Sequence, residues 1–362
     1  MLPLNWQKVR LGDICEIVKG QQINKISLNN TDKYPVINGG IDFLGYTNKF
    51  NVSKNTIAIS EGGTCGYVRF MSSNFWSGGH NYSLQKISNK VNNLCLYHIL
   101  KSYEKDIMKL GVGSGLKNIQ LKALKDFEIP LPPLNEQIAI ANILSDLDRY
   151  LCSLRALILK KESVKKALSF ELLSQRKRLK GFNQNWQKVR LGDICEIVKG
   201  QQINKISLNN TDKYPVINGG IDFLGYTNKF NVSKNTIAIS EGGTCGYVRF
   251  MSSNFWSGGH NYSLQKISNK VNNLCLYHIL KSYEKDIMKL GVGSGLKNIQ
   301  LKALKDFEIP LPPLNEQIAI ANILSDLDSE IISLKNKKRQ FENIKKALNH
   351  DLMSAKIRVL KK

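Results

Sequence analysis

At residues 5–20 the sequence reads NWQKVRLGDICEIVKG, and the same letters return at residues 185–200. The identity continues without a substitution, so that residues 5–148 recur as residues 185–328 at a constant offset of 180. An internal repeat of this length decides the architecture before any local pattern does. Either a very recent duplication or a deliberate joining of two copies explains it. Two identical surfaces in one chain suit two identical ligands, or one ligand with two equal halves.

The connectors that follow the repeated blocks, residues 149–184 and 329–362, are related but not identical. Matching residues at the offset of 180 include Lys165 with Lys345 and Arg178 with Arg358. The repeating unit is therefore a module followed by a connector. The differences fall where the two copies have to recognise each other rather than a common ligand.

The net charge of +23 is concentrated in the connectors. Each repeated block contributes +4, whereas residues 149–184 contribute +8 and residues 329–362 contribute +7. A basic field of this size attracts polyanions and speeds their capture. A membrane surface is the competing target, but the sequence has no lipidation motif and no strongly apolar amphipathic face.

The composition, with 42% hydrophobic and 22% charged residues in 362, indicates a soluble protein of two or three domains. No signal peptide and no run of 18 apolar residues is present. The seven cysteines are odd in number and form no CxxC pair. We therefore expect reduced thiols, packed as small apolar residues, in a cytoplasmic protein.

Each module is predicted to mix short strands, short helices and glycine-rich loops. Helical spacing over residues 94–108 and a short helix over 118–125 are expected, while prolines keep residues 127–133 extended. Gly111–Gly115 is expected to be a flexible loop because it lacks the spacing of a dinucleotide motif. The module is thus α/β or α+β. Its strands are predicted at residues 34–37, 55–60, 67–71 and 82–87.

After Pro133 the pattern changes to a helical stripe with 4-3-4-3-4 spacing, and the second copy repeats it. No Gly or Pro interrupts residues 134–180, so we expect a helix of roughly 45 residues, about 68 Å long. Two such helices most simply pair as an antiparallel coiled coil with internal pseudo-two-fold symmetry. The alternative is that each packs on its own module or on a partner. The stripe of the first copy consists of Ile140, Leu144, Leu147, Leu151, Leu154 and Ile158.

These patterns divide the chain into four segments. We expect globular modules over residues 1–133 and 181–313, and helical spacers over residues 134–180 and 314–362.

A search for catalytic motifs finds none. The chain lacks a GxxxxGK[ST] phosphate loop, the Asp/Asn-Pro-Pro-aromatic tetrapeptide of amino-methyltransferases, and HExxH or HxE metal motifs. His98 lies on a helical pattern and is expected to be structural, whereas His80 lies in a loop that suits ligand contact. Glu61 has no partner that would make it a general base. The sequence therefore predicts a protein without its own catalytic or metal site.

Several glycine-hinged loops of the module are suited to reading polar edges. Gln and Asn form paired hydrogen bonds with adenine, and Lys meets guanine or phosphate. The competing interpretation of each loop is an ordinary solvated surface. The candidate DNA-binding residues are Lys19, Gln21, Gln22, Asn24, Lys25, Gly62, Gly63, Thr64, Ser77, His80, Asn81, Ser114, Lys117 and Asn118, and in the second copy Lys199, Gln201, Gln202, Asn204, Lys205, Gly242, Gly243, Thr244, Ser257, His260, Asn261, Ser294, Lys297 and Asn298.

In this order the motifs resemble the specificity subunit of type I restriction–modification systems. The similarity spans essentially the whole chain, and its most specific element is the proline-rich junction that leads into a heptad helix twice. The markers are Trp6-x-x-Val9-x-Leu11-Gly12-Asp13-Ile14, Tyr34–Ile41 with Gly45-Tyr46, the Ile57-x-Ile59 strand with its Gly62–Gly66 turn, Ile129–Leu134 with Glu136-Gln137, and the tail Leu172-Leu173-Ser174 with Arg178-Leu179.

The resemblance implies a non-catalytic subunit with two target-recognition domains, each binding half of a bipartite site on double-stranded DNA. It also implies two modification subunits that use S-adenosylmethionine, and restriction subunits that use ATP and Mg²⁺. Members of the family usually carry two different recognition domains, whereas here the two are identical. Identical domains related by a two-fold axis predict an inverted-repeat site. The alternative function is a basic coiled-coil scaffold or adaptor that binds a protein or membrane partner.

Overall fold

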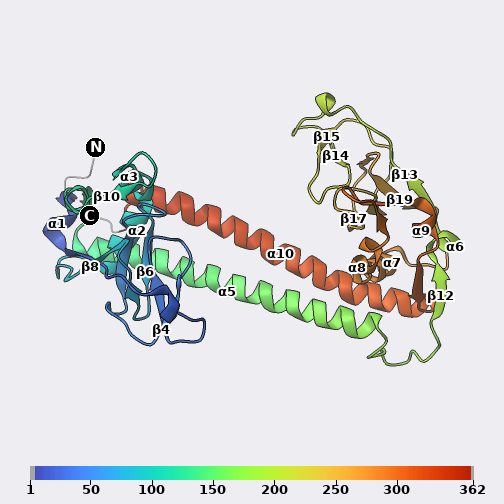
Figure 1. Cartoon of the computed structure of the whole chain (residues 1–362), viewed down its shortest axis with the longest axis horizontal. Coiled ribbons are helices and arrows are strands. Elements are labelled where there is room, and N and C mark those ends of the chain that lie inside the picture. Colours follow the sequence, from blue (N-terminus) through green and yellow to red (C-terminus); the bar gives the residue numbers. More distant parts are fainter. Residues whose placement is uncertain (1–4, 360–362) are drawn as a thin grey trace. The chain divides into compact units, whose positions relative to one another are not determined.

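The computed structural model describes residues 5–359, apart from the side chain of Ser207. The chain divides into two compact units, one formed by Met1–Arg155 with Asn336–Lys362 and the other by Ala156–Lys335. Each unit contains one globular module and one pair of helix segments (Figure 1).

The module of the first unit is built on a four-stranded antiparallel sheet in the order β2-β8-β5-β6. A smaller sheet has the order β4-β3-β7, and β1 pairs with β11 and β9 with β10. The strands are β1 (Gln7–Arg10), β2 (Glu16–Lys19), β3 (Tyr34–Ile37), β4 (Gly45–Thr47), β5 (Thr56–Ser60), β6 (Val68–Met71), β7 (Trp76–Ser77), β8 (Asn81–Gln85), β9 (Gly111–Val112), β10 (Asn118–Ile119) and β11 (Glu128–Leu131).

Short helices connect these strands. They are α1 (Leu11–Ile14), the 3-10 turn η1 (Lys25–Ser27), α2 (Asn93–Ser102), α3 (Glu104–Lys109) and α4 (Leu121–Lys125), followed by the long helix α5 (Leu134–Leu173). The helix expected over residues 94–108 is interrupted, because Tyr103 (φ −93°, ψ 9°) leaves the helical region between α2 and α3. The helix expected over residues 118–125 begins later, because residues 118 and 119 pair with β9 instead.

The second unit repeats these elements. They are β12 (Gln187–Arg190), α6 (Leu191–Ile194), β13 (Glu196–Lys199), η2 (Lys205–Ser207), β14 (Tyr214–Ile217), β15 (Gly225–Thr227), β16 (Thr236–Ser240), β17 (Val248–Met251), β18 (Trp256–Ser257), β19 (Asn261–Gln265), α7 (Asn273–Ser282), α8 (Glu284–Met288), β20 (Gly291–Val292), β21 (Asn298–Ile299), α9 (Leu301–Lys305), β22 (Glu308–Leu311) and α10 (Leu314–Met353). Together the two units confirm the predicted fold class of mixed α and β modules with two long helices.

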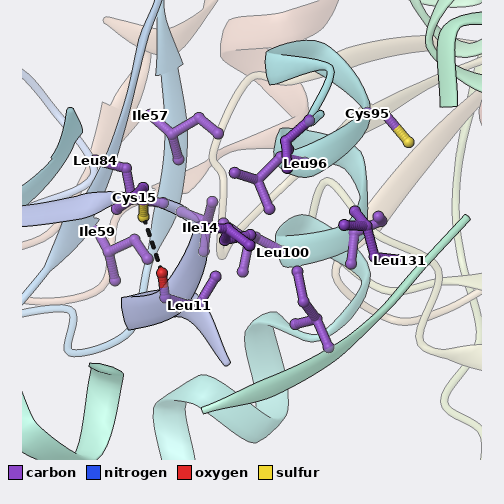
Figure 2. Close-up of a cluster of buried hydrophobic side chains, with 14 of the residues drawn as sticks. Leu11, Ile14, Cys15, Ile57, Ile59, Leu84, Cys95, Leu96, Leu100 and Leu131 are labelled. Atoms are coloured by element: carbon purple, nitrogen blue, oxygen red, sulfur yellow. Dashed lines mark hydrogen bonds between the residues drawn. The ribbon is translucent and has the colours of Figure 1, made fainter. Parts of the chain in front are cut away.

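The β5 strand shows why the sheet is covered on both faces. Successive side chains of a strand point to opposite faces. Ile57 and Ile59 join the main core with Leu96 and Leu100 of α2, whereas Ala58 joins a smaller cluster with Phe75. Figure 2 shows α2 laid across the first of these faces.

Cysteines occupy both core and surface positions. The Cys15 thiol is buried, lies 3.2 Å from the Leu11 carbonyl oxygen (Figure 2), and has its pKa raised to about 12 by burial. Cys95 is buried as well, with a pKa raised to about 12, first by burial and then by Glu136. The expectation of buried cysteines is wrong for Cys152, which is exposed on α5.

The long helices begin where the proline-rich junctions end, but they are shorter than expected. The α5 helix stops at Leu173 instead of Lys180, because Gln175 adopts a left-handed conformation (φ 60°) that turns the chain away. Ala355 (φ 54°) follows the end of α10 at the equivalent position. Sequence inspection missed these stops because no Gly or Pro marks them.

Within each unit the paired helix segments run antiparallel. In the first unit Asp148 pairs with Lys345 and Glu136 with Arg358, so the partner number falls as the other rises. In the second unit Lys165 pairs with Asp328, and Arg178 with Glu316 at 2.8 Å. These contacts confirm the predicted antiparallel pairing.

Candidate functional site

The candidate loops leave the four-stranded sheet at one end. Lys19, at the end of β2, lies opposite Tyr82 near the start of β8, and Ser60, at the end of β5, lies opposite Asn81. Because these strands are antiparallel neighbours, the segments after β2, after β5 and before β8 share one edge. The sheet therefore gathers three loops that are distant in sequence.

Close backbone packing holds two of these loops together. A Cβ atom on Gly20 would lie 2.2 Å from the Gly78 carbonyl oxygen, so only glycine fits there. Gln21 donates its backbone N–H to the Ser77 carbonyl oxygen (2.8 Å) and accepts from Trp76 Nε1 (2.9 Å). The loop after β2 is thus fixed to the loop before β8.

The side chain of Gln22, from the loop after β2, lies close to the loop before β8 that carries His80. A Cβ atom on Gly79 would come within 2.7 Å of the Gln22 amide nitrogen, which shows that this side chain passes over the glycine. The His80 backbone N–H donates to Asn38 Oδ1 (3.1 Å), while the imidazole is exposed. An amide and an imidazole are therefore presented together to solvent, where either can meet a polar partner.

Lys19 is engaged by a carboxylate at this edge. Its Nζ lies 2.6 Å from Glu61 Oε1, and the same oxygen accepts from Tyr82 Oη at 3.2 Å. Burial raises the pKa of Tyr82 to about 12, with Glu61 adding to the shift. Glu61 is therefore part of a structural network, and much of the charge on Lys19 is balanced within the protein.

The β9–β10 hairpin is attached to the same edge. The Ile119 backbone N–H donates to the Glu61 carbonyl oxygen (2.9 Å), and a Cβ atom on Gly62 would meet Asn118 Oδ1 at 2.2 Å. Residues 114–118, which precede these contacts, are exposed. The segment expected to be a loop begins instead as strand β9.

The predicted site residues separate into exposed and buried sets. Gly62, Ser77 and Asn81 are buried, so their side chains and backbone support the loops rather than face solvent. Thr64 is half-buried. The exposed set comprises Lys19, Gln21, Gln22, Asn24, Lys25, Gly63, His80, Ser114, Lys117 and Asn118.

The second module repeats this edge. Lys199 pairs with Glu241 at 2.7 Å, and Trp256 Nε1 donates to the Gln201 carbonyl oxygen at 2.9 Å. In this module Thr244 is half-buried, and Gly242, Ser257 and Asn261 are buried. Its exposed set is Lys199, Gln201, Gln202, Asn204, Lys205, Gly243, His260, Ser294, Lys297 and Asn298.

Sequence inspection missed two exposed apolar side chains in the loops that extend from this edge. Ile26 is 92% exposed in η1, and Leu116 is 82% exposed in the β9–β10 hairpin. The signal available in the sequence was an aliphatic residue inside an otherwise polar loop.

The junction at the start of α5 explains the Glu136-Gln137 motif. Glu136 is buried and accepts hydrogen bonds from Trp6 Nε1 (3.2 Å) and from Arg358 Nε (2.7 Å). The Gln137 side chain donates to the Pro132 carbonyl oxygen (2.7 Å) and accepts from the Asn92 backbone N–H (2.7 Å). These two residues fasten module, helix and connector together.

Two further features bear on chemistry. Across residues 5–359, His, Cys, Asp and Glu side chains form no group of three or more that could hold a metal ion. In the same part of the chain, no helix combines the length and the apolar character needed to cross a membrane.

Comparison with known proteins shows the family. The type I restriction modification DNA specificity domain matches the chain twice, at residues 3–162 and 183–343. A type I specificity subunit of Mycoplasma genitalium is 31% identical over 316 residues, covering 85% of this chain and 82% of that protein. A type I restriction enzyme specificity subunit of Methanocaldococcus jannaschii is 31% identical over 372 residues, covering 95% of this chain and 84% of that protein.

A solved structure agrees with these relatives. The crystal structure of the type I restriction–modification S subunit from M. genitalium has a TM-score of 0.81 and 28% sequence identity, and covers 97% of this chain and 98% of its own. The chain belongs to the type I restriction–modification specificity subunits, which are the non-catalytic, DNA-recognising components of these systems. This confirms the resemblance derived from the motifs.

Proposed function

We propose that this subunit reads a bipartite DNA site made of two equal half-sites in inverted orientation. Each module supplies one reading edge, composed of the loops around Gln22, His80 and Lys117 or their counterparts. The observation that carries the proposal is the identity of the two edges, residue for residue, in one chain.

The direction of the helices supports inverted rather than direct repetition of the half-sites. In each unit the helix that leaves one module runs antiparallel to the helix that leaves the other, as Lys165–Asp328 and Lys345–Asp148 indicate. DNA strands are also antiparallel, so a two-fold protein presents equal surfaces to equal sequences on opposite strands.

Charge supports nucleic acid as the ligand. The net charge is +23, and Lys25 and Lys117 are exposed at the reading edge. Lysine contacts to phosphate release counterions, so affinity falls steeply as salt rises. Binding that hardly changes with salt would favour the alternative of a scaffold for a protein or membrane partner.

The long helices are the proposed docking surface for the catalytic subunits. Leu159, Phe170 and Ile332 are 63%, 53% and 59% exposed on α5 and α10, which suits a further protein surface. We propose that two modification subunits, which bring S-adenosylmethionine, dock here in the cytoplasm. Restriction subunits with ATP and Mg²⁺ complete the assembly.

Selection from random double-stranded DNA tests the proposal. The full-length chain, with and without its modification subunits, should enrich an inverted repeat with an unread gap. A direct repeat, a single short site or no enrichment contradicts it. Incubation of the chain alone with DNA and S-adenosylmethionine should give no methyl transfer, and transfer would contradict the assignment of catalysis to the partners.

A further inference from the structure

One apolar side chain stands out on the reading edge. Ile26 is 92% exposed, and Ile206 in the second copy is 91% exposed. Its chain neighbours Asn24, Lys25 and Ser27 are polar and exposed. Covering a branched aliphatic side chain with an apolar group removes its surface from water, which lowers the free energy of the complex.

The turn that carries Ile26 is ordered by its own side chains. Asn24 Oδ1 accepts a hydrogen bond from the Ile26 backbone N–H (3.0 Å), and Ser27 Oγ donates to the Asn24 carbonyl oxygen (2.7 Å). In the second copy Asn204 Oδ1 accepts from the Ile206 backbone N–H at 3.0 Å. Because the turn is capped, the side chain is presented in a defined direction.

This turn lies in the same loop as Gln21 and Gln22 of the reading edge. Four residues separate Ile26 from Gln21, which is hydrogen-bonded to Trp76 and Ser77. Lys25, directly before Ile26 in the chain, is also exposed and carries a positive charge. Leu116 is the weaker candidate for such a contact. A Cβ atom on its neighbour Gly115 would meet no atom within 4 Å, so little packs against that loop, whereas the Ile26 turn is capped.

The major groove of DNA offers a matching group. Thymine carries a C5 methyl there, and apolar side chains distinguish thymine by contact with it. A lysine next to the apolar side chain suits the phosphates that border the groove. We propose that Ile26 and Ile206 each cover the C5 methyl of one thymine, at equivalent positions of the two half-sites.

This inference rests on the proposed function and deepens it. The test uses the full-length chain and the DNA that it enriches, with thymine replaced by uracil at one symmetric pair of positions at a time. Uracil lacks only the methyl group. At one pair, the wild-type chain should lose about fourfold in affinity for each methyl removed, as expected for one buried carbon.

The variant with Ile26→Ala and Ile206→Ala should bind the thymine site more weakly and show no further loss with uracil at that pair. Ile26→Val with Ile206→Val should keep the uracil effect, because the branched surface remains. The matched control, Ile41→Ala with Ile221→Ala, removes apolar side chains that are 56% and 55% exposed outside the capped turn, and it should also keep the uracil effect.

Two results would overturn the inference while leaving the proposed function intact. One is an enriched site without thymine in its half-sites. The other is an equal response to uracil in the wild-type chain and in the Ile26→Ala, Ile206→Ala variant. Failure of the wild-type chain to enrich any DNA would instead overturn the proposed function, and this inference with it.

Discussion

The Tyr150 ring packs against Phe341 with the ring centroids 4.7 Å apart, at the positions where the second unit pairs Glu330 with Lys161 at 2.8 Å. Residue 330 is residue 150 shifted by 180, and residue 341 is residue 161 shifted by 180. The helix pair is therefore closed by an aromatic contact in one unit and by an ion pair in the other. The connectors differ in sequence where their contacts differ in kind.

The two contacts should respond differently to salt. A double-mutant cycle of Tyr150→Ala and Phe341→Ala should give a coupling free energy of about 1 kcal/mol that is independent of salt. The cycle of Lys161→Ala and Glu330→Ala should give roughly 0.5 kcal/mol or less, vanishing at high salt, because the pair is partly exposed. Urea unfolding at two salt concentrations measures both. Equal salt dependence would contradict the assignment.

Glu136 and Glu316 provide a matched pair of tests for the junctions. Glu136 joins Trp6, near the start of the chain, to Arg358, near its end, whereas Glu316 joins Trp186 and Arg178. Glu136→Ala should expose the two chain ends to protease, because each loses its buried partner. Glu316→Ala should instead expose residues 174–186. Mass spectrometry of limited digests locates the cleavage, and identical patterns for the two variants would show that these contacts do not hold the segments.

Two buried histidines should make stability depend on pH. Burial, reinforced by Lys345 and opposed by Asp148, lowers the pKa of His98 to about 4, and burial with Lys165 does the same for His278. Between the ordinary value of 6.5 and about 4 the unfolded chain binds these protons and the folded chain does not. Stability should therefore fall with decreasing pH in this window, by up to about 1.4 kcal/mol per pH unit for each histidine.

The control for this pH effect is a variant that cannot titrate. His98→Gln with His278→Gln should flatten the pH dependence of the free energy of unfolding between pH 6.5 and 4, even if it lowers stability overall. An unchanged slope would assign the effect to other groups.

Alanine substitutions at Gly20 and Gly115 test whether close backbone packing at a loop glycine stabilises the loops. Gly20→Ala with Gly200→Ala forces a Cβ atom against the backbone of residue 78 or 258 and should destabilise the loops by about 1–3 kcal/mol. DNA affinity should fall with it. In Gly115→Ala with Gly295→Ala, the added Cβ atoms meet no atom within 4 Å, so neither stability nor DNA affinity should change. Thermal unfolding and DNA titration distinguish the two, and equal effects would contradict the packing argument.

Spacer length should set the unread gap. Deletion of residues 152–158 together with 335–341 removes one heptad from each helix in the register defined by Asp148–Lys345 and Lys165–Asp328. Each heptad is about 10.5 Å long, equivalent to about 3 base pairs. The DNA enriched by this variant should have a gap shorter by about that amount, or binding should be lost. An unchanged gap would show that the helices do not measure it.

Much of the fold could be predicted because its signals are local. The proline-rich segment before Leu134 forces an extended strand and then permits a helix, and the alternation in residues 55–60 identifies β5. The stop at Leu173 could not be predicted, because a left-handed Gln175 follows from contacts made elsewhere rather than from the residue type.

The sequence could predict which loops form the candidate site, but not which of their side chains are exposed to solvent. Ser77 and Asn81 have the polar character of a contact residue, yet packing between loops buries them. Lys19 reads as a free cation until Glu61, which is 42 residues away, is placed beside it. Ile26 reads as an ordinary aliphatic residue until the capped turn is seen to hold it in solvent. Each of these outcomes depends on pairing between distant segments.

The most direct measurement compares two DNA duplexes that contain the same enriched half-sites and the same gap. In one the half-sites form an inverted repeat, and in the other they form a direct repeat. We predict that the chain binds the inverted repeat more tightly than the direct repeat, and that the direct repeat binds no better than a duplex with one half-site. Equal affinity for the two arrangements, or a preference for the direct repeat, would contradict it.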